Sequence, residues 1–333
     1  MKKLWSLLML PPLALFGLWL WMFMAPTVAA PLQVDVRAQA VDLVEDNPKL
    51  RRVGALHYMG GLVLTSTDRH FGGLSALLWL GDGQMLALSD RGHLLRWHIQ
   101  MRGTRPARLG PVALYPLRNH QGVSAEEEKR DSESLVVDGD TLWVATEHDN
   151  RIYSYALRDL GAPAMEEAAP PAMAHWENNG GPETMAHLPD GRLLVISEDP
   201  PSGMNASAGL VFAPPQWDRP ALRFTYHPPE GFRPTDAVVV DATWMLVLHR
   251  QASLLHGVRA DIGLVRIADI LAGGDVRAQS IARLERPMTV DNMEGLALER
   301  SGGRFYLWLT SDDNFNPLQR TLLLRFLWDG PPR

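Results

Sequence analysis

The sequence contains no cysteine among its 333 residues. This absence excludes disulfide bonds, thiolate metal ligands, a cysteine nucleophile and lipidation of an N-terminal cysteine. The sequence also lacks an excess of basic residues, because its formal net charge is −6. A chain without a strongly basic surface does not attract phosphate backbones, so we do not expect a nucleic-acid partner.

Charge is absent from a long apolar run that extends from Leu4 to Met24. Lys2 and Lys3 precede this run, and the small residues of segment 25–30 follow it. This order is typical of a secretory signal peptide, and the run is also nearly long enough to span a bilayer. We therefore expect residues 1–30 to be a signal peptide or, through residues 4–24, an inner-membrane anchor. The rest would be exported to the periplasm, either soluble after cleavage or anchored.

Helical periodicity is almost absent, and a repeated hairpin pattern is present in its place. Each copy has two short apolar runs around a tight turn and ends in a charged residue. The five copies span residues 74–91, 133–147, 183–198, 236–250 and 294–312. Equivalent positions 75, 133, 183, 236 and 294 recur every 50 to 58 residues, which is typical of a repeat architecture.

A unit of about 50 residues with up to four strands is typical of a β-propeller blade. We therefore predict that residues 31–333 form an all-β propeller. Five hairpins are visible, and segment Gly54–Thr65 adds strands that would complete another blade or close the ring. We expect six blades, with a short helix near residues 267–271. A β-sandwich is the alternative fold.

Charged residues recur at two positions of the hairpin, the start of its first strand and the end of its second. In a propeller both positions lie on one face, beside the central channel. The first set is Ser75, Glu133, Glu183, Asp236 and Glu294; the second is Asp90, Glu147, Glu198, Arg250 and Asp312. The repeat therefore predicts a ring composed mostly of carboxylates.

Several carboxylates in one cavity repel each other, so raised pKa values, cationic side chains or a bound cation must compensate. Oxygen ligands without cysteine favour Ca²⁺ before Mg²⁺. The predicted metal ligands are Asp90, Glu133, Glu183, Asp236, Glu294 and Asp312. Arg91, Arg250 and Arg320 would share the neutralisation or bind an anionic substrate. In the alternative interpretation, these acids bind backbone amides and only fix the fold.

The turn Asp312-Asp313-Asn314-Phe315-Asn316 follows the last hairpin. Its oxygen-bearing residues have the 1-3-5 spacing of a calcium loop, but Pro317 and Leu323 replace the glycine and glutamate of an EF-hand. The segment is therefore either an oxygen-rich turn that contacts a metal or an ordinary Asx-type turn.

Other candidates are weaker. Ser75 lacks the second glycine of a hydrolase nucleophile motif and opens a strand, which argues against a serine nucleophile. Three histidines close to the second strands are possible acid–base groups, although ordinary packing is the commoner role: His93, His148 and His249. Four repeated tryptophans are expected to pack between blades: Trp79, Trp143, Trp244 and Trp308.

Five motifs, in this order, resemble the phytase-like domain, whose bacterial members are described as having the esterase-like activity of phytase. They are DSESLVV at 131–137, NNGGPETMA at 178–186, PTDAVVV at 234–240, DNMEGLAL at 291–298 and SDDNFN at 311–316. The resemblance covers roughly residues 55 to 330. It implies a propeller, export and hydrolysis of a phosphoester or carboxylester. His249-Arg250 departs from it, because an acidic residue is commoner there.

These observations favour an exported, calcium-dependent hydrolase that acts as a monomer on a small anionic or ester substrate. Glu147 or Glu198 would be the general base, while Arg91 and Arg250 would hold the substrate anion. Two alternatives stay open: a non-catalytic binding propeller of the cell envelope, and a lactonase-like propeller that also uses a carboxylate-bound cation.

Overall fold

A computed structural model describes residues 30–198, 206–253 and 257–332 of the chain. The predicted signal or anchor segment lies outside the described residues, except for Ala30, and stays a prediction. In the part of the chain that is described, no helix has the length and apolar character needed to cross a membrane.

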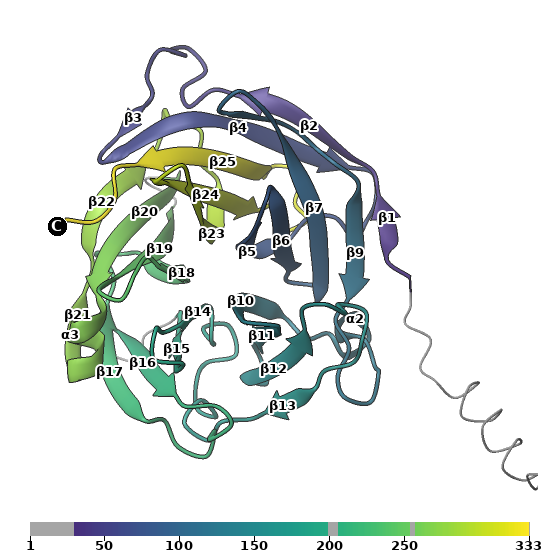
Figure 1. The fold of residues 1–333 in the computed structure, drawn as a ribbon, viewed down its shortest axis with the longest axis vertical. Coiled ribbons are helices and arrows are strands. Elements are labelled where there is room, and N and C mark those ends of the chain that lie inside the picture. Colours follow the sequence, from purple (N-terminus) through teal and green to yellow (C-terminus); the bar gives the residue numbers. More distant parts are fainter. Residues whose placement is uncertain (1–29, 199–205, 254–256, 333) are drawn as a thin grey trace, which may run out of the picture. The chain divides into compact units, whose positions relative to one another are not determined.

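The described strands form five sheets arranged as blades around a central axis (Figure 1). Blade 1 contains β5 (Leu74–Gly81), β6 (Gln84–Ser89), β7 (His93–Arg102), β8 (Arg105–Leu109), β9 (Val112–Pro116) and β1 (Leu32–Val34). Blade 2 contains β10 (Ser132–Asp138), β11 (Thr141–Thr146), β12 (Arg151–Ala156) and β13 (Glu166–Ala168). Blade 3 contains β14 (Thr184–His187), β15 (Leu193–Ile196), β16 (Ser207–Phe212), β17 (Leu222–His227) and β21 (Gly274–Arg277).

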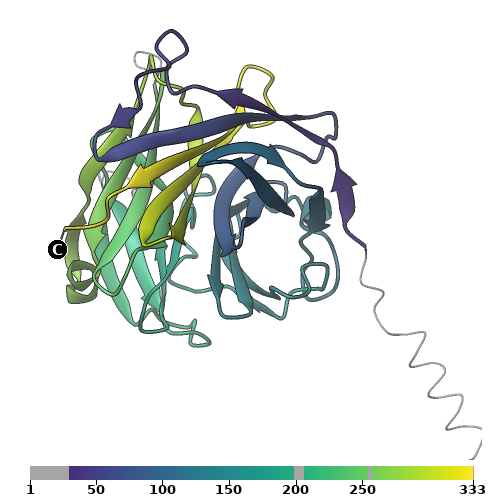
Figure 2. The ribbon, with the colours of Figure 1, turned by 45° about the horizontal axis from the view of Figure 1, so that its top comes forward.

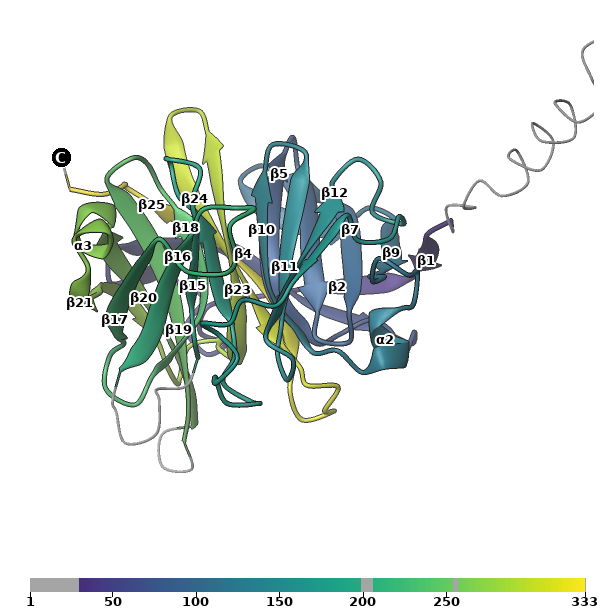
Figure 3. The ribbon, with the colours of Figure 1, turned by 90° about the horizontal axis from the view of Figure 1, so that it is seen from below.

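Blade 4 contains β18 (Arg233–Val239), β19 (Trp244–Ser253), β20 (Gly257–Arg266) and β22 (Gln279–Leu284). Blade 5 contains β23 (Asn292–Ser301), β24 (Arg304–Asp312), β25 (Thr321–Trp328), β4 (Leu56–Ser66), β2 (Val36–Val41) and β3 (Arg52–Val53). Two short helices are described, α2 (Ala125–Glu128) and α3 (Ile267–Ala272), and α3 confirms the helix expected near residue 267. Figure 3 views the ring edge-on, with the strands running between its two faces.

The propeller fold is confirmed, but the prediction of six blades is wrong, because the described strands build five. Segment Gly54–Thr65 provides most of β4, which pairs antiparallel with β25 near the C-terminus (Figure 2). The segment therefore closes the ring as an outer strand of blade 5 and does not begin a blade of its own. The innermost strands β5, β10, β14, β18 and β23 contact one another in turn and complete the circle.

The hydrophobic core lies between adjacent blades. Each of the five buried apolar clusters joins two neighbouring blades, as when Leu86 of blade 1 packs with Leu135 of blade 2. Trp79 and Trp308 stack with ring centroids 6.0 Å apart between blades 1 and 5. Burying such aromatic surface stabilises the blade contacts. The expected packing role is therefore confirmed for Trp79 and Trp308.

Candidate functional site

Four of the innermost strands contain a β-bulge at nearly the same position near their start. The extra residue is Ser75 in β5, Glu133 in β10, Thr235 in β18 and Glu294 in β23. In blade 3, Glu183 lies directly before β14. A bulge changes the direction of one side chain and interrupts the regular strand pairing. Bulges are therefore common beside functional sites.

The second set of residues lies where the second strand of each blade ends. The amides of Asp90, Glu147 and Glu198 donate to the carbonyls of Gly73, Asp131 and Gly181 at 2.8, 2.9 and 3.0 Å. Asp312 pairs with Asn292, and Arg250 pairs with Arg233. These backbone pairs hold the five side chains at equivalent positions of the five blades.

A cavity of about 220 Å³ lies among these residues. Its lining is Asp90, Asp131, Glu133, Glu147, Asn179, Glu183, Glu198, Arg250, Glu294, Asp312 and Asn314. The structure thus brings together eight of the ten residues that we predicted for the site. The two exceptions are Asp236 and Arg91.

Asp236 lies one residue beyond the bulge of β18, and this displacement removes it from the cavity. Thr235, and not Asp236, is equivalent to Glu133 and Glu294. The buried carboxylate of Asp236 accepts hydrogen bonds from the amides of Ala237 at 2.8 Å and Leu296 at 2.7 Å. Asp236 therefore fits the alternative interpretation, in which an acid fixes the fold through backbone amides.

Arg91 lies beside the cavity and not in it. Its guanidinium carbon is 3.3 Å from the centroid of the Phe315 ring, and Nη1 donates to the carbonyl of Arg69 at 3.3 Å. Arg91 lines an adjoining pocket of about 320 Å³, which we call the basic pocket after its three cationic side chains, although three acids line it as well. Its other lining residues are Asp90, Glu126, Lys129, Arg130 and Asp131, so the two cavities share Asp90 and Asp131.

The carboxylates of the cavity are strongly buried. Five of them expose only 4–8% of their surface: Glu147, Glu183, Glu198, Glu294 and Asp312. Burial and neighbouring carboxylates raise the pKa values of Glu133 and Glu183 well above their usual range. Burial likewise raises the pKa of Glu294, although Arg250 opposes the shift. In this cavity full ionisation is therefore unfavourable unless a cation compensates.

Three further carboxyl groups titrate close to neutral pH. Burial, opposed by a backbone hydrogen bond in each case, raises the pKa of Asp90 to about 7, that of Glu147 to about 7 and that of Asp312 to about 6. Oε1 of Glu147 accepts the Gly181 amide at 2.9 Å. A Cβ atom on Gly181 would lie only 2.6 Å from Oδ1 of Asn150, so this close approach requires glycine.

Arg250 is the cation among the residues that line the cavity. Its Nη2 lies 2.7 Å from Oε1 of Glu198, and its Nε lies 3.3 Å from Oε1 of Glu294. Nη1 donates to Oδ1 of Asn292 at 3.3 Å. Although burial lowers it, the surrounding carboxylates keep the pKa of Arg250 above its usual value, so this side chain is positively charged.

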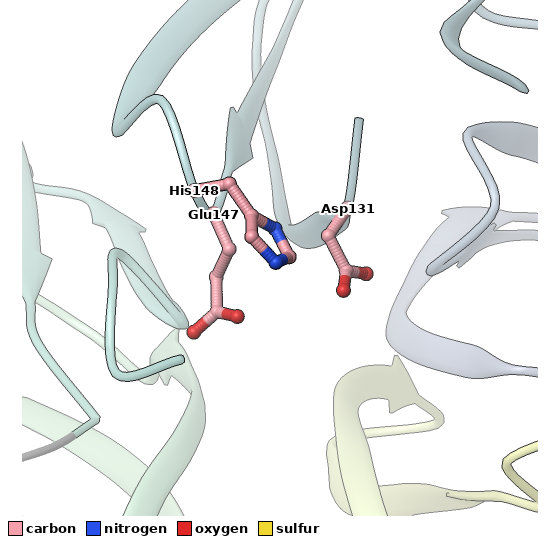
Figure 4. Close-up of side chains that lie close together, drawn as sticks. All are labelled: Asp131, Glu147 and His148. Atoms are coloured by element: carbon pink, nitrogen blue, oxygen red, sulfur yellow. The ribbon is translucent and has the colours of Figure 1, made fainter. Parts of the chain in front are cut away.

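Sequence reasoning missed Asp131 and Asn179. Ligand atoms of Asp131, Glu147 and His148 lie within 4.8 Å of one another, with the imidazole between the two carboxylates (Figure 4). A usable signal was present, because Asp131 lies two residues before Glu133, as Asn292 lies before Glu294. The position two residues before the bulge pairs with the end of the second strand. Asn179 comes from a loop that has no equivalent in the repeat.

The turn after β24 has the geometry of an Asx turn. Oδ1 of Asp312 accepts the Asn314 amide at 2.6 Å, and both residues line the cavity. Oδ1 of Asn316 instead accepts the Leu318 amide at 3.1 Å. Asp313 joins the turn to blade 1, because its Oδ1 accepts the Gly73 amide at 2.9 Å. The predicted oxygen-rich turn therefore brings Asp312 and Asn314 to the cavity and leaves Asn316 outside its lining.

The weaker sequence candidates lie away from the cavity, with the exception of His148. Ser75 donates to the carbonyl of Ser132 at 2.7 Å and joins blades 1 and 2. His249 is fully buried and lies 2.6 Å from the hydroxyl of Tyr226. Burial lowers the pKa values of His93 and His249 to about 4, so both are neutral near pH 7.

The donor set fits a hard divalent cation, because carboxylate and amide oxygens dominate the lining. Such a cavity can bind a cation, hold a water molecule between carboxylates and exchange protons near neutral pH. It offers no thiol, and its arginine is engaged by carboxylates.

Comparison with solved structures finds proteins with partial structural similarity. The glutaminyl cyclase of Myxococcus xanthus is 12% identical with a TM-score of 0.44, covering 83% of this chain and 97% of its own. The allergen Mala s 1 of Malassezia sympodialis is 12% identical with a TM-score of 0.41, covering 90% and 96%. The PQQ-bound aldose sugar dehydrogenase of Streptomyces coelicolor is 12% identical with a TM-score of 0.40, covering 89% and 100%.

A search of curated protein sequences gives no match. A family model described as "Phytase-like: Esterase-like activity of phytase" matches residues 69–315. These residues include all five hairpins and every residue that lines the cavity. Since the match spans well over half of the sequence, the chain belongs to the phytase-like family.

Proposed function

We propose that this phytase-like propeller is a divalent-cation-dependent hydrolase of a phosphoester or carboxylester. One observation carries the proposal: eight carboxylates from four blades line a single cavity of about 220 Å³ together with one arginine. Scaffolding alone does not require so many negative charges at one place, because burying unpaired charge is costly. Ca²⁺ is the cation that this oxygen-only donor set favours.

The cation would be held by carboxylates that Arg250 does not engage. Asp90, Asp131 and Glu133 come from blades 1 and 2 and lie beside Glu183 and Asp312, which leaves Glu147 uncoordinated. A cation bound there would neutralise these groups and polarise a phosphoryl or acyl oxygen of the substrate. The protein's own contribution is the fixed placement of the oxygens on strand ends and bulges.

Glu147 has the properties of a general base. The Gly181 amide fixes its Oε1, and its pKa of about 7 means that it both accepts and releases a proton near neutral pH. His148, which follows it in the chain, lies within 4.8 Å through its ring nitrogen. Glu198 is the less suitable base, because the Arg250 guanidinium lies 2.7 Å from its carboxylate.

The basic pocket provides a place for the anionic part of a substrate. It adjoins the acidic cavity through Asp90 and Asp131, and the side chains of Arg91 and Lys129 are exposed there. A substrate spanning both would place its anion near these cations and its ester group near the carboxylates. This arrangement favours a small anionic ester over a neutral one.

Turnover of simple substrates by the purified protein tests the proposal. We expect hydrolysis of an aryl phosphate, an aryl carboxylester or both, which EDTA abolishes and Ca²⁺ restores. Glu147→Gln should lose at least 100-fold in kcat while its circular dichroism stays unchanged. Absence of turnover on phosphate, carboxylester and lactone substrates, with calcium binding retained, would instead favour a non-catalytic binding propeller.

We also propose that the chain is exported, as its N-terminal sequence indicates. Lys2 and Lys3 followed by the apolar run Leu4–Met24 support this proposal. Cell fractionation should place the full-length chain in the periplasm or at the inner membrane. A variant lacking residues 1–30 should accumulate in the cytoplasm, and equal distribution of both forms would contradict export.

A further inference from the structure

Arg250 occupies a position at which every other blade provides a carboxylate. The equivalent residues at the end of the second strand are Asp90, Glu147, Glu198 and Asp312. Blade 4 also lacks an acid at the bulge, where it has Thr235 and blades 2 and 5 have Glu133 and Glu294. Blade 4 thus contributes a positive charge, and no carboxylate, to the cavity lining.

The guanidinium of Arg250 joins the two blades that flank its own. Nη2 lies 2.7 Å from Glu198 in blade 3, and Nε lies 3.3 Å from Glu294 in blade 5. Nη1 reaches Oδ1 of Asn292, also in blade 5, at 3.3 Å. Each of the three guanidinium nitrogens is therefore directed to a residue at the edge of the acidic cavity. The side chain serves as an internal counter-ion for these carboxylates.

By contrast, among the described residues no lysine or arginine forms an ion pair with the carboxylates that blades 1 and 2 contribute to the cavity. Asp90, Asp131, Glu133 and Glu147 lie on this side, together with His148. Arg91, which lines the basic pocket, is held against the Phe315 ring. The negative charge of the cavity is therefore unevenly compensated between its two sides.

We propose that Arg250 replaces a second metal ion, and so limits the cavity to cation binding on the side of blades 1 and 2. This inference rests on the proposed function in one respect, that the cavity binds a divalent cation. It changes the predicted role of Arg250 from a ligand for the substrate anion to a residue that sets the number and place of bound cations.

The physical reason is the repulsion between Glu198 and Glu294 when the guanidinium that lies between them is lost. If the guanidinium is removed, the buried carboxylates of Glu198 and Glu294 lie close together with only empty volume between them. Their mutual repulsion makes ionisation of both groups unfavourable. A divalent cation of suitable size restores the compensation by binding oxygens of the same two residues and of Asn292. Loss of Arg250 should therefore create a cation site and not only weaken the protein.

Calcium titration by isothermal calorimetry on the full chain tests this inference. Arg250→Met is expected to bind one Ca²⁺ more than the wild type, and adding Glu198→Gln should weaken the gained site at least tenfold. Arg250→Lys, which keeps the charge, should retain the wild-type stoichiometry. Arg91→Met, which removes a charge outside the acidic cavity, should also leave the stoichiometry unchanged.

Thermal unfolding provides a second readout. In EDTA, Arg250→Met should unfold at a lower temperature than the wild type, and saturating Ca²⁺ should raise its Tm by a larger increment than that of the wild type. If Arg250→Met does not fold, Arg250→Gln keeps a hydrogen-bond donor for Glu198 and is expected to gain the same cation.

The two proposals fail in different ways. An unchanged stoichiometry and unchanged calcium increment in Arg250→Met and Arg250→Gln would overturn the counter-ion role while leaving the hydrolase proposal intact. Absence of any cation binding by the wild type would overturn the proposed function. In that case, a single Ca²⁺ gained by Arg250→Met would still support the counter-ion role, and none gained would overturn it.

Discussion

The carboxylate of Asp236 accepts a 2.7 Å hydrogen bond from the backbone amide of Leu296, which belongs to the neighbouring blade. Its other oxygen accepts the Ala237 amide at 2.8 Å. Asp236 is 2% exposed, so these donors have no water to replace the carboxylate. The side chain thus links blades 4 and 5 through hydrogen bonds and does not line the cavity.

Asp236→Ala is therefore expected to destabilise the fold without changing cation binding. Leaving buried amides unpaired and creating a small void should cost about 2–4 kcal/mol of the free energy of unfolding. Urea unfolding monitored by tryptophan fluorescence measures this loss. Calcium affinity of the folded variant should equal that of the wild type, and a loss of calcium binding with unchanged stability would contradict this role.

The case of Asp236 also shows where sequence reasoning reached its limit. The repeat predicted the hairpins and the convergence of their ends, because apolar runs and turns are local signals. It could not place Thr235 at the bulge, because a bulge is defined by pairing with β19 and a one-residue slip reverses side-chain direction. The acid nearest in sequence was therefore assigned to the site.

Blade number and Asp131 were missed for a related reason. The strand β4 has the composition of any blade strand, and only its pairing with β25 shows that it closes the ring. Asp131 precedes its strand and enters the cavity because the Glu147 amide binds its carbonyl at 2.9 Å. The pairing of β4 leaves no local mark in the sequence, whereas the position of Asp131 two residues before Glu133 was a usable signal.

Calcium should stabilise the folded protein if the cavity binds it. At a free concentration about 100-fold above the Kd, binding to the folded state alone adds about 2.7 kcal/mol, or roughly 5 °C in Tm. Glu183→Gln should reduce this increment to less than half, because it removes a buried carboxylate from the lining. Glu127→Gln, a change in an exposed helix, is the matched control and should retain the increment.

The metal-free protein should lose stability as pH rises from about 4.5 to 7. Burial raises the pKa values of Asp90 and Glu147 to about 7, so the folded state binds more protons than the unfolded state across this interval. Stability then falls with rising pH until these groups ionise in both states. Thermal unfolding in EDTA at several pH values measures the slope, and a rising stability over the same interval would contradict the burial of these acids.

Calcium affinity should change with pH in the opposite direction. A cation binds the ionised carboxylates, so binding releases protons and strengthens as pH rises from 5 to 8. Calorimetry in buffers of different ionisation enthalpy counts the released protons. A pH-independent affinity would indicate that the cation binds outside the cavity formed by Glu147, Asp90 and Asp312.

Arg91→Met separates substrate binding from cation binding. If the basic pocket holds the anionic part of the substrate, this variant should raise KM at least tenfold for an anionic ester and leave a neutral ester unaffected. Its calcium-induced rise in Tm should match that of the wild type, because Arg91 lies outside the lining of the acidic cavity. Equal losses for both esters would show that Arg91 does not select charge.

A buried ion pair in blade 5 offers a test of the fold that is independent of the cavity. Nη2 of Arg325 lies 2.7 Å from Oε1 of Glu299, whose Oε2 also accepts the indole nitrogen of Trp308 at 2.8 Å. Both charged residues are nine-tenths buried, so Glu299→Gln leaves the guanidinium without its counter-ion and should cost about 3–5 kcal/mol. Because Nη1 of Arg325 also donates to the carbonyl of Thr104 in blade 1, this loss should weaken the contact between blades 5 and 1.

Hydrogen exchange of the backbone amides measures this effect. Exchange should accelerate first in β24 and β25, whereas uniform acceleration across all blades would show that the ring unfolds as one unit.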